Sequence, residues 1–522
     1  MSQHVYAAAL IGVEAFLVQV EVDIAGGLPT FVVVGLPEVA IREARMRVQA
    51  AITNCQLPFP TGRITVNLAP AHIRKDGTGF DLPVALALLA ADHRIPPAAL
   101  SEALVLGELS LSGRVRPVRG ILAAVEAARR QGLKTVLVAE ENGEEASLIR
   151  GIEVRKVKCL SDAVRWFEAH DADAAPLVPP TTIEPTTNSQ HLDLSDVVGQ
   201  KMARRALEVA AAGNHNFLMM GGPGSGKTML ARRLPGILPP LNEDEAIEVT
   251  RIYSVAGLNL GGGVISDRPF RSPHHTCSAP GLIGGGAGMP RPGELTLAHR
   301  GVLFLDELPE FSRLALEVLR QPVESQEVIL CRAAGTIQYP ADVTLVAAMN
   351  PCPCGYANDP RKQCRCTIHE KQRYQNRVSG PLLDRVDIQI DVPPVHHIFA
   401  KGDDEPECSA RVRERVCKAR SRQTKRLGPK RTNGRMTPQE MKIHCQLEPP
   451  MQQMMINAAH HVGLSARSQD RILKVARTIA DLAQCESIAM AHLAEAMQYN
   501  RGFLGDSRGV NSPQSHSAPM AL

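Results

Sequence analysis

The stretch GGPGSGKT, residues 221–228, has the residue types and the spacing that a polyphosphate-binding loop requires. Its glycines allow successive backbone N–H groups to face phosphate oxygens at the start of a helix. We expect Lys227 to contact the β- and γ-phosphates of ATP, and Thr228 to bind Mg²⁺. A strand-like run before the stretch and a helical run after it favour this function over a glycine-rich turn without a ligand. The predicted nucleotide-binding residues are Gly221, Gly222, Pro223, Gly224, Ser225, Gly226, Lys227 and Thr228.

An acidic pair ends a second apolar run. The sequence VLFL, residues 302–305, predicts a buried strand, and Asp306 and Glu307 follow it. Asp306 is expected to hold Mg²⁺, and Glu307 to orient or deprotonate the attacking water. An isolated acidic pair could simply cap a buried strand, but the phosphate-binding loop about 80 residues upstream favours the catalytic interpretation.

A third apolar run, DVTLVAAM at residues 342–349, leads to Asn350. In a parallel sheet this residue would lie beside Asp306, where an amide can hold the attacking water or sense the γ-phosphate. We therefore predict that Asn350 joins Lys227 and Glu307 in the catalytic set.

Four thiols follow this strand within one short loop. They are Cys352, Cys354, Cys364 and Cys366. The loop has little apolar material, so a tetrahedral zinc ion bound by the four sulfurs would fix its shape. The C-x-C spacing is tighter than the usual C-x₂-C, and Pro353 and Gly355 could supply the turn that it needs. Four reduced thiols without a metal, or a redox switch, are the alternatives.

The composition of the whole chain sets the context for these sites. A chain of 522 residues, 44% hydrophobic and 21% charged, is expected to form several globular domains. The longest uncharged apolar run, residues 82–91, is too short to cross a membrane, and the N-terminus lacks a basic secretory segment, so we expect a cytoplasmic protein. Most of the 12 cysteines are scattered, as reduced thiols are. An aromatic content of 3% predicts that any nucleic-acid contact rests on Lys, Arg and backbone groups.

Changes in composition divide the chain. The predicted divisions are a domain at 1–170, a Pro/Thr-rich linker at 171–190, a core at 191–400, a basic connecting segment at 401–435, a helical domain at 436–500 and a disordered tail at 501–522. The basic segment could contact DNA, or it could be a solvated helix face. Its cations are Arg411, Arg413, Arg415, Lys418, Arg420, Arg422, Lys425, Arg426, Lys430, Arg431 and Arg435.

The motifs together resemble those of an AAA+ ATPase, including the later stretches SGPLLDRVD and SARSQDRILKVARTIA. Three more stretches, RPFRSPHHT, PRPGELTLAHRGVLFLDELPEF and NPCPCG, are similar to the magnesium-chelatase-like ComM/YifB family, and the resemblance covers nearly the whole chain. It implies an α/β fold: a Lon-protease-like N-terminal α/β domain, a central P-loop AAA+ parallel sheet with helices on both faces, and a C-terminal helical lid.

The resemblance also implies a homo-hexameric ring. Arg385 matches the arginine finger, which reaches the nucleotide of a neighbouring subunit, and Arg467 matches the sensor-2 arginine of the lid. A planar guanidinium suits the charge that spreads over a transferring phosphoryl group. Whether Arg467 acts in cis or in trans is left open.

Two insertions interrupt the predicted core domain at 191–400. The Gly-rich segment 256–295 is far longer than a usual connection, and residues 327–341 predict a hairpin. In the chelatase and replicative-helicase branch that the chain resembles, such insertions line the central pore. Arg332 would then touch a threaded polymer, or it is an exposed hairpin charge. His274 and His275 are interpreted as loop or subunit-contact residues.

Two N-terminal stretches, KDGTGFDLPVALALLA and GELSLSGRVRPV, resemble the proteolytic domain of Lon, which uses a Ser nucleophile and a Lys base. Gly79 falls at the Ser position and Leu122 at the Lys position, and neither can do nucleophilic chemistry. Thr78 is adjacent but has no evident base. We therefore predict a module for assembly or polymer binding and no active protease.

The resemblance to ComM/YifB implies a motor that couples ATP hydrolysis to movement on single-stranded or branched DNA. Such a motor would be a helicase or branch-migration enzyme in recombination or natural transformation, and other recombination proteins would be its partners. The alternative is a chelatase-type motor subunit that remodels a protein partner for metal insertion. The expected cofactors are ATP and Mg²⁺, with Zn²⁺ at the cysteine loop.

Overall fold

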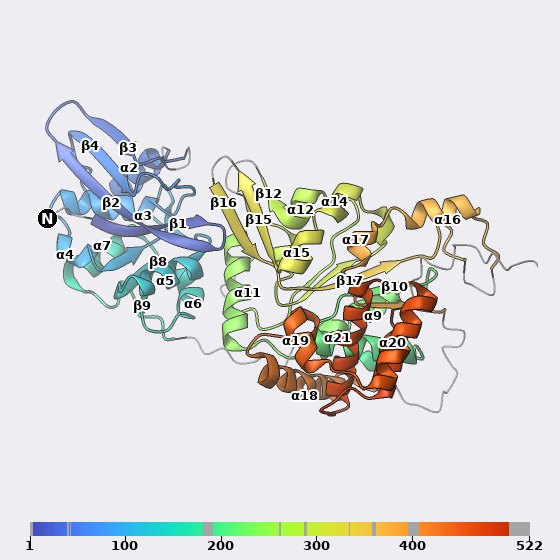
Figure 1. Ribbon diagram of the computed structural model, residues 1–522. Coiled ribbons are helices and arrows are strands. Elements are labelled where there is room, and N and C mark those ends of the chain that lie inside the picture. The colour runs from blue at the N-terminus through green and yellow to red at the C-terminus, as the bar shows by residue number, and fades with distance from the viewer. Residues whose placement is uncertain are drawn as a thin grey trace, which may run out of the picture.

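The computed structural model contains a seven-stranded sheet, a five-stranded sheet and a C-terminal group of helices (Figure 1). The structure describes residues 4–38, 41, 43–180, 192–259, 263–286, 290–332, 335–357, 362–394 and 407–500. Residues 181–190 of the predicted linker, residues 401–406 of the predicted basic segment and the predicted tail at 501–522 lie outside these ranges.

The N-terminal domain is a mixed sheet with the strand order β3-β4-β2-β1-β5-β8-β9. Its strands are β1 (His4–Ile11), β2 (Glu14–Ala25), β3 (Thr30–Val34), β4 (Arg63–Ala69), β5 (Ala103–Val105), β8 (Thr135–Ala139) and β9 (Glu153–Val157). The other elements are α2 (Ala44–Asn54), α3 (Asp81–Ala91), α4 (Pro97–Leu100), β6 (Glu108–Leu109), β7 (Val115–Arg116), α5 (Ile121–Arg130), α6 (Gly143–Ala146) and α7 (Leu160–Ala169). The long apolar run is the buried helix α3. Ala175 and Val178 pack in the same core, so residues 171–178 belong to this domain, although we predicted them to be linker.

The central sheet is fully parallel, with the order β11-β14-β17-β10-β18. Its strands are β10 (Phe217–Met220), β11 (Phe270–Arg271), β14 (Val302–Leu305), β17 (Thr344–Met349) and β18 (Ile388–Asp391). Phe217 and Met219 face one hydrophobic core, and Leu218 and Met220 face another. The strands are apolar throughout because both faces of the sheet are covered.

Helices surround this sheet. They are α8 (Lys201–Gly213), α9 (Lys227–Ala231), α10 (Leu234–Ile237), α11 (Glu243–Ala256), α12 (Ala279–Ile283), α13 (Glu294–Leu297), α14 (Arg313–Glu317), α15 (Arg320–Ser325), α16 (Ile368–Gln375) and α17 (Gly380–Leu383). Two hairpins arise from the predicted insertions: β12 (Gly284–Gly285) with β13 (Arg291–Pro292), and β15 (Glu327–Arg332) with β16 (Gly335–Pro340). The hairpin predicted at 327–341 is confirmed.

The C-terminal helices are α18 (Ser409–Leu427), α19 (Pro438–His444), α20 (Pro449–Val462), α21 (Ala466–Leu482) and α22 (Met490–Gln498). Val412, Val416 and Ala419 of α18 share a core with α21, α8 and one face of the central sheet. The segment that we predicted as a basic connection is therefore a packed helix of the C-terminal group. The predicted fold class, an α/β chain with a parallel central sheet and a helical C-terminal region, is confirmed.

The N-terminal domain docks on the central domain through the turn between β1 and β2 (Figure 1). Val13 packs in the core that contains Ile337 and Tyr339 of β16. At Gly12, a Cβ atom would lie 2.8 Å from Ile337 Cγ2, so the close approach requires glycine. Arg251 of α11 forms an ion pair of 2.9 Å with Glu126 of α5.

Candidate active site

The phosphate-binding loop joins β10 to α9. Gly224 and Gly226 have φ angles of 74° and 90°, a region that side chains with a Cβ rarely adopt. Lys227 is buried, and its Nζ donates to the carbonyls of Gly221 at 2.7 Å and Gly222 at 2.9 Å. Burial lowers the pKa of Lys227, and the nearby carboxylates of the acidic pair oppose that effect.

The ends of three neighbouring strands bring the predicted residues together. Strand β17 lies between β10 and β14, so that their carboxyl ends meet at one edge of the sheet. Thr228 Oγ1 donates to Asp306 Oδ2 at 2.7 Å, and Lys227 Nζ donates to Asn350 Oδ1 at 3.3 Å. Four of the predicted residues thus form one contiguous polar group.

Glu307 projects from the same strand end with a left-handed backbone, φ 51°. Its Oε2 lies 3.4 Å from Nδ1 of His275, which comes from the Gly-rich insertion. A positive φ is uncommon for a residue with a Cβ and often marks a functional position. His275 is therefore placed to orient the carboxylate, a contact that its position in a long loop did not predict.

The cysteine loop forms a compact sulfur cluster. Cys352 Sγ lies 3.3 Å from Cys354 Sγ and 3.7 Å from Cys364 Sγ, and Cys366 belongs to the same group, within 4.8 Å. Tetrahedral zinc with Zn–S bonds of about 2.3 Å requires sulfurs about 3.8 Å apart, so the donor set fits this ion. Burial raises the pKa of Cys352 to about 12, whereas the backbone N–H of Tyr356 lowers the pKa of Cys354 to about 6.

This cluster also touches the phosphate-binding loop. A Cβ atom on Gly355 would lie 2.6 Å from Pro223 Cδ, and one on Gly222 would lie 3.1 Å from the carbonyl oxygen of Gly355. Gly355 has a φ of 83°. The cysteine loop and the phosphate-binding loop are therefore in direct van der Waals contact.

The two predicted arginines lie elsewhere. Arg385 Nη2 bonds Glu324 Oε2 at 2.5 Å, and Arg385 and Arg467 line one open groove of about 590 Å³. Among the described residues, neither arginine contacts Lys227 or Asn350. The structure thus pairs Arg385 with Arg467 but does not bring them to the phosphate-binding loop of the same chain.

A neighbouring arginine connects the lid to this segment. Arg471 of α21 is buried and donates to the carbonyls of Leu383 at 3.0 Å and Val386 at 2.6 Å. These two residues flank the predicted finger, so a movement of α21 would move Arg385. A sequence pattern could have suggested a buried face on α21, but not this contact.

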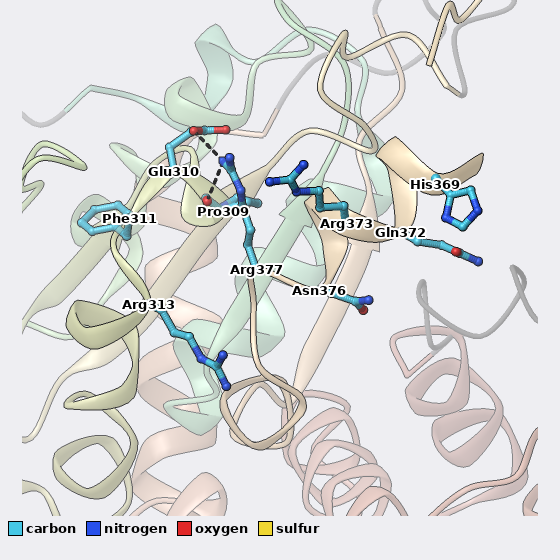
Figure 2. A pocket seen from close by; sticks show the side chains of 9 residues that line it. All are labelled: Pro309, Glu310, Phe311, Arg313, His369, Gln372, Arg373, Asn376 and Arg377. Carbon is cyan, nitrogen blue, oxygen red and sulfur yellow. Dashed lines mark hydrogen bonds and ion pairs between the residues drawn. The ribbon is translucent and has the colours of Figure 1, made fainter. Parts of the chain in front are cut away.

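An open groove of about 740 Å³ lies beside the acidic pair, between α16 and the chain after β14 (Figure 2). It is lined by Pro309, Glu310, Phe311, Arg313, His369, Gln372, Arg373, Asn376 and Arg377. Arg377 is paired with Glu310 at 2.9 Å, whereas Arg373 is exposed and has no ion-pair partner among the described residues. Most of the polar groups that line the groove are hydrogen-bond donors, which suits an anionic ligand.

Most arginines of α18 form hydrogen bonds or ion pairs with other residues of the same chain. Arg415 bonds Glu208 and Glu407, Arg426 bonds Asp481, and Arg420 donates to a backbone carbonyl. The helix therefore offers less free positive charge to a nucleic acid than the sequence suggested.

The N-terminal domain has a cleft of about 540 Å³ at the position aligned with the Lon site. Gly79 lines this cleft, and the hydroxyl of Thr78 donates to the carboxylate of Glu108. Leu122 is fully buried in the core of the domain. Among the described residues that line the cleft there is no lysine that could act as a base.

Gln200 is a further neighbour of the phosphate-binding loop that we did not predict. Its Nε2 donates to the carbonyls of Ser225 at 3.3 Å and Pro393 at 2.5 Å. The sequence carries no spacing signal for such a contact, since a whole helix and a strand separate Gln200 from the loop.

Arg332 is exposed at the end of β15, which agrees equally with a pore residue and with an exposed hairpin charge.

Comparison with known proteins gives matches over most of the chain. Family models described as "Magnesium chelatase, subunit ChlI", "Subunit ChlI of Mg-chelatase" and "Magnesium chelatase, subunit ChlI C-terminal" match residues 193–398, 20–142 and 406–500. The chain is 44% identical over 500 residues to competence protein ComM of Haemophilus influenzae. The aligned residues are 95% of this chain and 96% of that protein. It is 43% identical over 496 residues to YifB of Escherichia coli, with 95% and 96% covered.

A shorter match confirms the predicted Lon similarity. Lon protease 1 of Syntrophobacter fumaroxidans is 33% identical over 107 residues, which are 20% of this chain and 13% of that protein. In the described ranges, every helix is too short or too polar to cross a bilayer. Family models and full-length relatives agree with the motifs and the fold, and the chain belongs to the magnesium-chelatase-like AAA+ family that includes ComM and YifB.

Proposed function

We propose that the chain is a ring-forming ATPase that couples ATP hydrolysis to movement on DNA, in helicase or branch-migration reactions of recombination or natural transformation. The observation that carries the proposal is the contact of Lys227, Thr228, Asp306 and Asn350 at three adjacent strand ends. The relation to a protein named for competence supports the DNA-directed role.

Each residue has a distinct role in this proposal. Lys227 leaves the carbonyls that now hold its ammonium group and binds the β- and γ-phosphates. Thr228 and Asp306 are already hydrogen-bonded and would share Mg²⁺, which neutralises phosphate charge. Glu307, oriented by His275, activates the attacking water, and Asn350 positions it.

The positions of the two arginines support the proposed ring. Arg385 does not contact the phosphate-binding loop of its own chain and stands with Arg467 in an open groove. A finger placed this way completes a site only on a neighbouring copy, where its guanidinium would stabilise the charge of the transferring phosphoryl group.

Zinc has a structural role in this proposal. Cys352, Cys354, Cys364 and Cys366 would hold the ion, whose binding fixes the loop that follows Asn350 and abuts Pro223. The described residues that line the N-terminal cleft include no lysine, and its one hydroxyl–carboxylate contact joins Thr78 to Glu108, so the Ser and Lys of Lon are both missing and we propose that this domain does not hydrolyse peptides.

The donor-rich groove beside the acidic pair is the proposed contact for DNA phosphates. Replacing Arg373 with Ala should weaken DNA binding at all sequences and reduce the salt dependence of binding by about one phosphate contact. Binding is measured by fluorescence anisotropy over a range of salt concentrations. Arg165→Ala, which removes an exposed arginine of the N-terminal domain, is the matched control.

The main test measures ATP hydrolysis with and without single-stranded and four-way-junction DNA, and then branch migration on the junction. We expect stimulation by DNA that weakens as salt increases, and no turnover in Lys227→Ala or Glu307→Gln. ATP turnover without any response to DNA would contradict the DNA-directed role while leaving the ATPase assignment intact.

The second candidate is a motor subunit that remodels a protein partner for metal insertion. It is favoured by the three matching family models, because each describes a magnesium-chelatase subunit. ATP hydrolysis that responds to a protein fraction and not to DNA would support it.

A further inference from the structure

A cavity of about 370 Å³ lies at the edge of the central sheet opposite the phosphate-binding loop. Asn214, Gly301 and Thr344, which line it, lie at the amino ends of β10, β14 and β17. The start of α11 and the segment between α18 and α19 close its other sides. The cavity is thus separate from the proposed ATP site and lies where the sheet meets the C-terminal helices.

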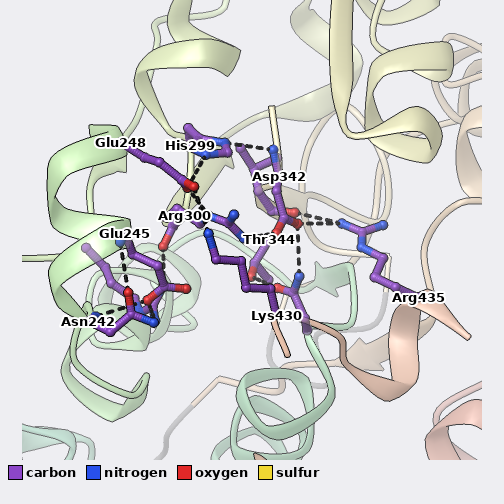
Figure 3. A network of polar contacts seen from close by, with 12 residues as sticks. Asn242, Glu245, Glu248, His299, Arg300, Asp342, Thr344, Lys430 and Arg435 are labelled. Carbon is purple, nitrogen blue, oxygen red and sulfur yellow. Dashed lines mark hydrogen bonds and ion pairs between the residues drawn. The ribbon is translucent and has the colours of Figure 1, made fainter. Parts of the chain in front are cut away.

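Basic side chains outnumber acidic ones on its walls. The basic residues are Arg268, Arg300, Arg420, Lys430, Arg431 and Arg435, and the acidic residues are Asp244, Glu245 and Asp342. Two of these acids are already engaged, because Arg268 pairs with Glu245 at 3.1 Å and Arg300 bonds Asp342 at 2.9 Å. Figure 3 shows that Arg300 also bonds the nearby Glu248, at 2.9 Å. The nearby Lys430 also bonds Glu248, at 2.9 Å.

Arg420 is the cation that this network leaves without a counter-charge. Its Nε and Nη2 both donate to the carbonyl of Ala211, at 3.1 and 2.6 Å, and no carboxylate in the described ranges forms an ion pair with it. Burial and the neighbouring Arg268 lower the pKa of Arg420 to about 10. Two guanidinium groups therefore repel each other here, at a half-buried position.

An unsatisfied hydroxyl gives independent evidence for a ligand. Thr432 lines the cavity and is only 7% exposed, and its Oγ1 has no hydrogen-bond partner among the described residues. Arg435 also lines the cavity: its two Nη groups donate to the carbonyls of Val323 and Val343, while its buried Nε has no partner among the described residues. Buried donors are rarely left unpaired in a folded protein, because each costs the desolvation of a polar group.

We propose that this cavity binds a phosphate group through Arg420, Thr432 and Arg435. A phosphate group supplies the negative charge that Arg420 lacks, and its several oxygens can accept from a guanidinium and a hydroxyl together. Bound there, it would join the sheet to the segment that leads into the lid. The group could be free phosphate or part of a DNA strand, and the site does not depend on the proposed motor function.

The test uses the full chain saturated with Mg²⁺ and a non-hydrolysable ATP analogue, so that the phosphate-binding loop is occupied. Thermal melting is followed in inorganic phosphate and in chloride of equal ionic strength, and then in chloride with an oligodeoxythymidylate. Phosphate or the oligonucleotide should raise Tm above the chloride value, and the one whose effect Thr432→Val reduces identifies the source of the group. No rise with either would overturn the proposal.

Variants separate a ligand site from a purely structural network. Arg420→Gln should weaken the apparent phosphate affinity by roughly tenfold or more, because a charge-assisted hydrogen bond is lost. Thr432→Val removes the unpaired hydroxyl at nearly constant shape, so it should raise Tm in chloride and reduce the rise caused by phosphate.

Lys425→Gln is the matched control, because it removes a positive charge from the same helix at an exposed position outside the cavity. It should respond to phosphate as the unaltered chain does. If Arg420→Gln folds poorly, the rise in Tm that phosphate or the oligonucleotide causes in Thr432→Val decides whether the cavity binds the anion. A full response to the same anion by Thr432→Val would overturn the proposal.

Discussion

At the scale of single residues, the site depends on small polar groups fixed by strand ends. Asn350 Oδ1 accepts from Lys227 Nζ, so the amide helps to hold the lysine at the strand ends. The two carboxylates of the acidic pair have different partners, because Thr228 donates to Asp306 while Glu307 lies near His275. In the proposed mechanism this separation suits one carboxylate for Mg²⁺ and the other for the attacking water.

Replacing Asn350 with Ala should lower kcat for ATP hydrolysis by roughly 10²-fold, the usual effect of removing one positioned polar group from a reacting centre. Binding of a non-hydrolysable ATP analogue, measured by calorimetry, should change little. Asn376→Ala, an exposed amide on the same side of the sheet, should keep normal turnover. Equal turnover in both variants would show that Asn350 has no catalytic role.

A buried carboxyl group gives a prediction about pH. Glu145 is 2% exposed at the contact between α6 and α11, and burial raises its pKa although Ser254 and the amide of Leu122 oppose this. The folded chain therefore holds the proton more tightly than the unfolded chain does. The stability that this group contributes is present below its ordinary pKa and is lost as pH rises through the raised value.

Glu145→Gln should therefore raise Tm at pH 8 by about 2–4 °C, the shift that roughly 1 kcal/mol causes in a domain of this size. The difference from the unaltered chain should shrink as pH falls toward 5. Glu144→Gln, at the exposed neighbouring position, should show no such trend. A difference that stays constant from pH 5 to pH 8 would rule out ionisation of Glu145 as the cause.

At the scale of elements, the cysteine loop stands apart because it has few apolar residues to pack. Its conformation must therefore be fixed in another way, such as by a bound metal ion. It connects β17 to α16, and Gly355 lies against Pro223. Any change in its shape would therefore reach both Asn350 and the phosphate-binding loop.

Purified chain should contain about one zinc ion per subunit, measured by atomic absorption, and Cys354→Ser should lose it. Loss of the ion should raise KM for ATP and lower Tm, because the loop no longer supports Pro223. Cys485→Ser, outside the cluster, should keep both zinc and turnover. Metal-free protein with four titratable thiols and full activity would instead favour reduced cysteines.

The sequence predicted the site best where polar residues directly follow strands of the central sheet. The meeting of Asp306 and Asn350 could be predicted because each follows a fully apolar run, and a parallel sheet covered on both faces aligns such ends. Lys227 could be predicted because it lies in the glycine-rich pattern at 221–228. The contact of His275 could not, because a long loop places it through tertiary packing alone. The sequence suggested a helix in the basic segment but not its packing, because the many charges concealed the apolar positions Val412, Val416 and Ala419.

At the scale of the whole molecule, the arginines predict cooperation between copies of the chain. Arg471 of α21 donates to the two carbonyls that flank Arg385, so we expect a movement of this helix to displace the proposed finger. A lid that responds to the nucleotide on its own subunit would thereby displace the finger that serves the next one.

Mixing two inactive variants tests this arrangement. Arg385→Ala should bind ATP but not hydrolyse it, and Lys227→Ala should not bind it. Mixed rings contain boundaries with one intact loop and one intact finger, so ATP turnover should return to a measurable fraction of normal. Recovery would fail if Arg385 acted within its own chain. Arg313→Ala, an exposed arginine outside both sites, should be active alone.

The core shared by α8, α18, α21 and one face of the central sheet has a consequence for cooperativity. A lid that merely rested on the nucleotide could melt by itself, as a separate calorimetric event. Here the C-terminal helices form part of the hydrophobic core beneath the central sheet. We therefore expect the helices and the sheet to unfold in a single transition. Ending the chain ahead of Ser409 would then expose that interior and yield an aggregate, not a lidless enzyme.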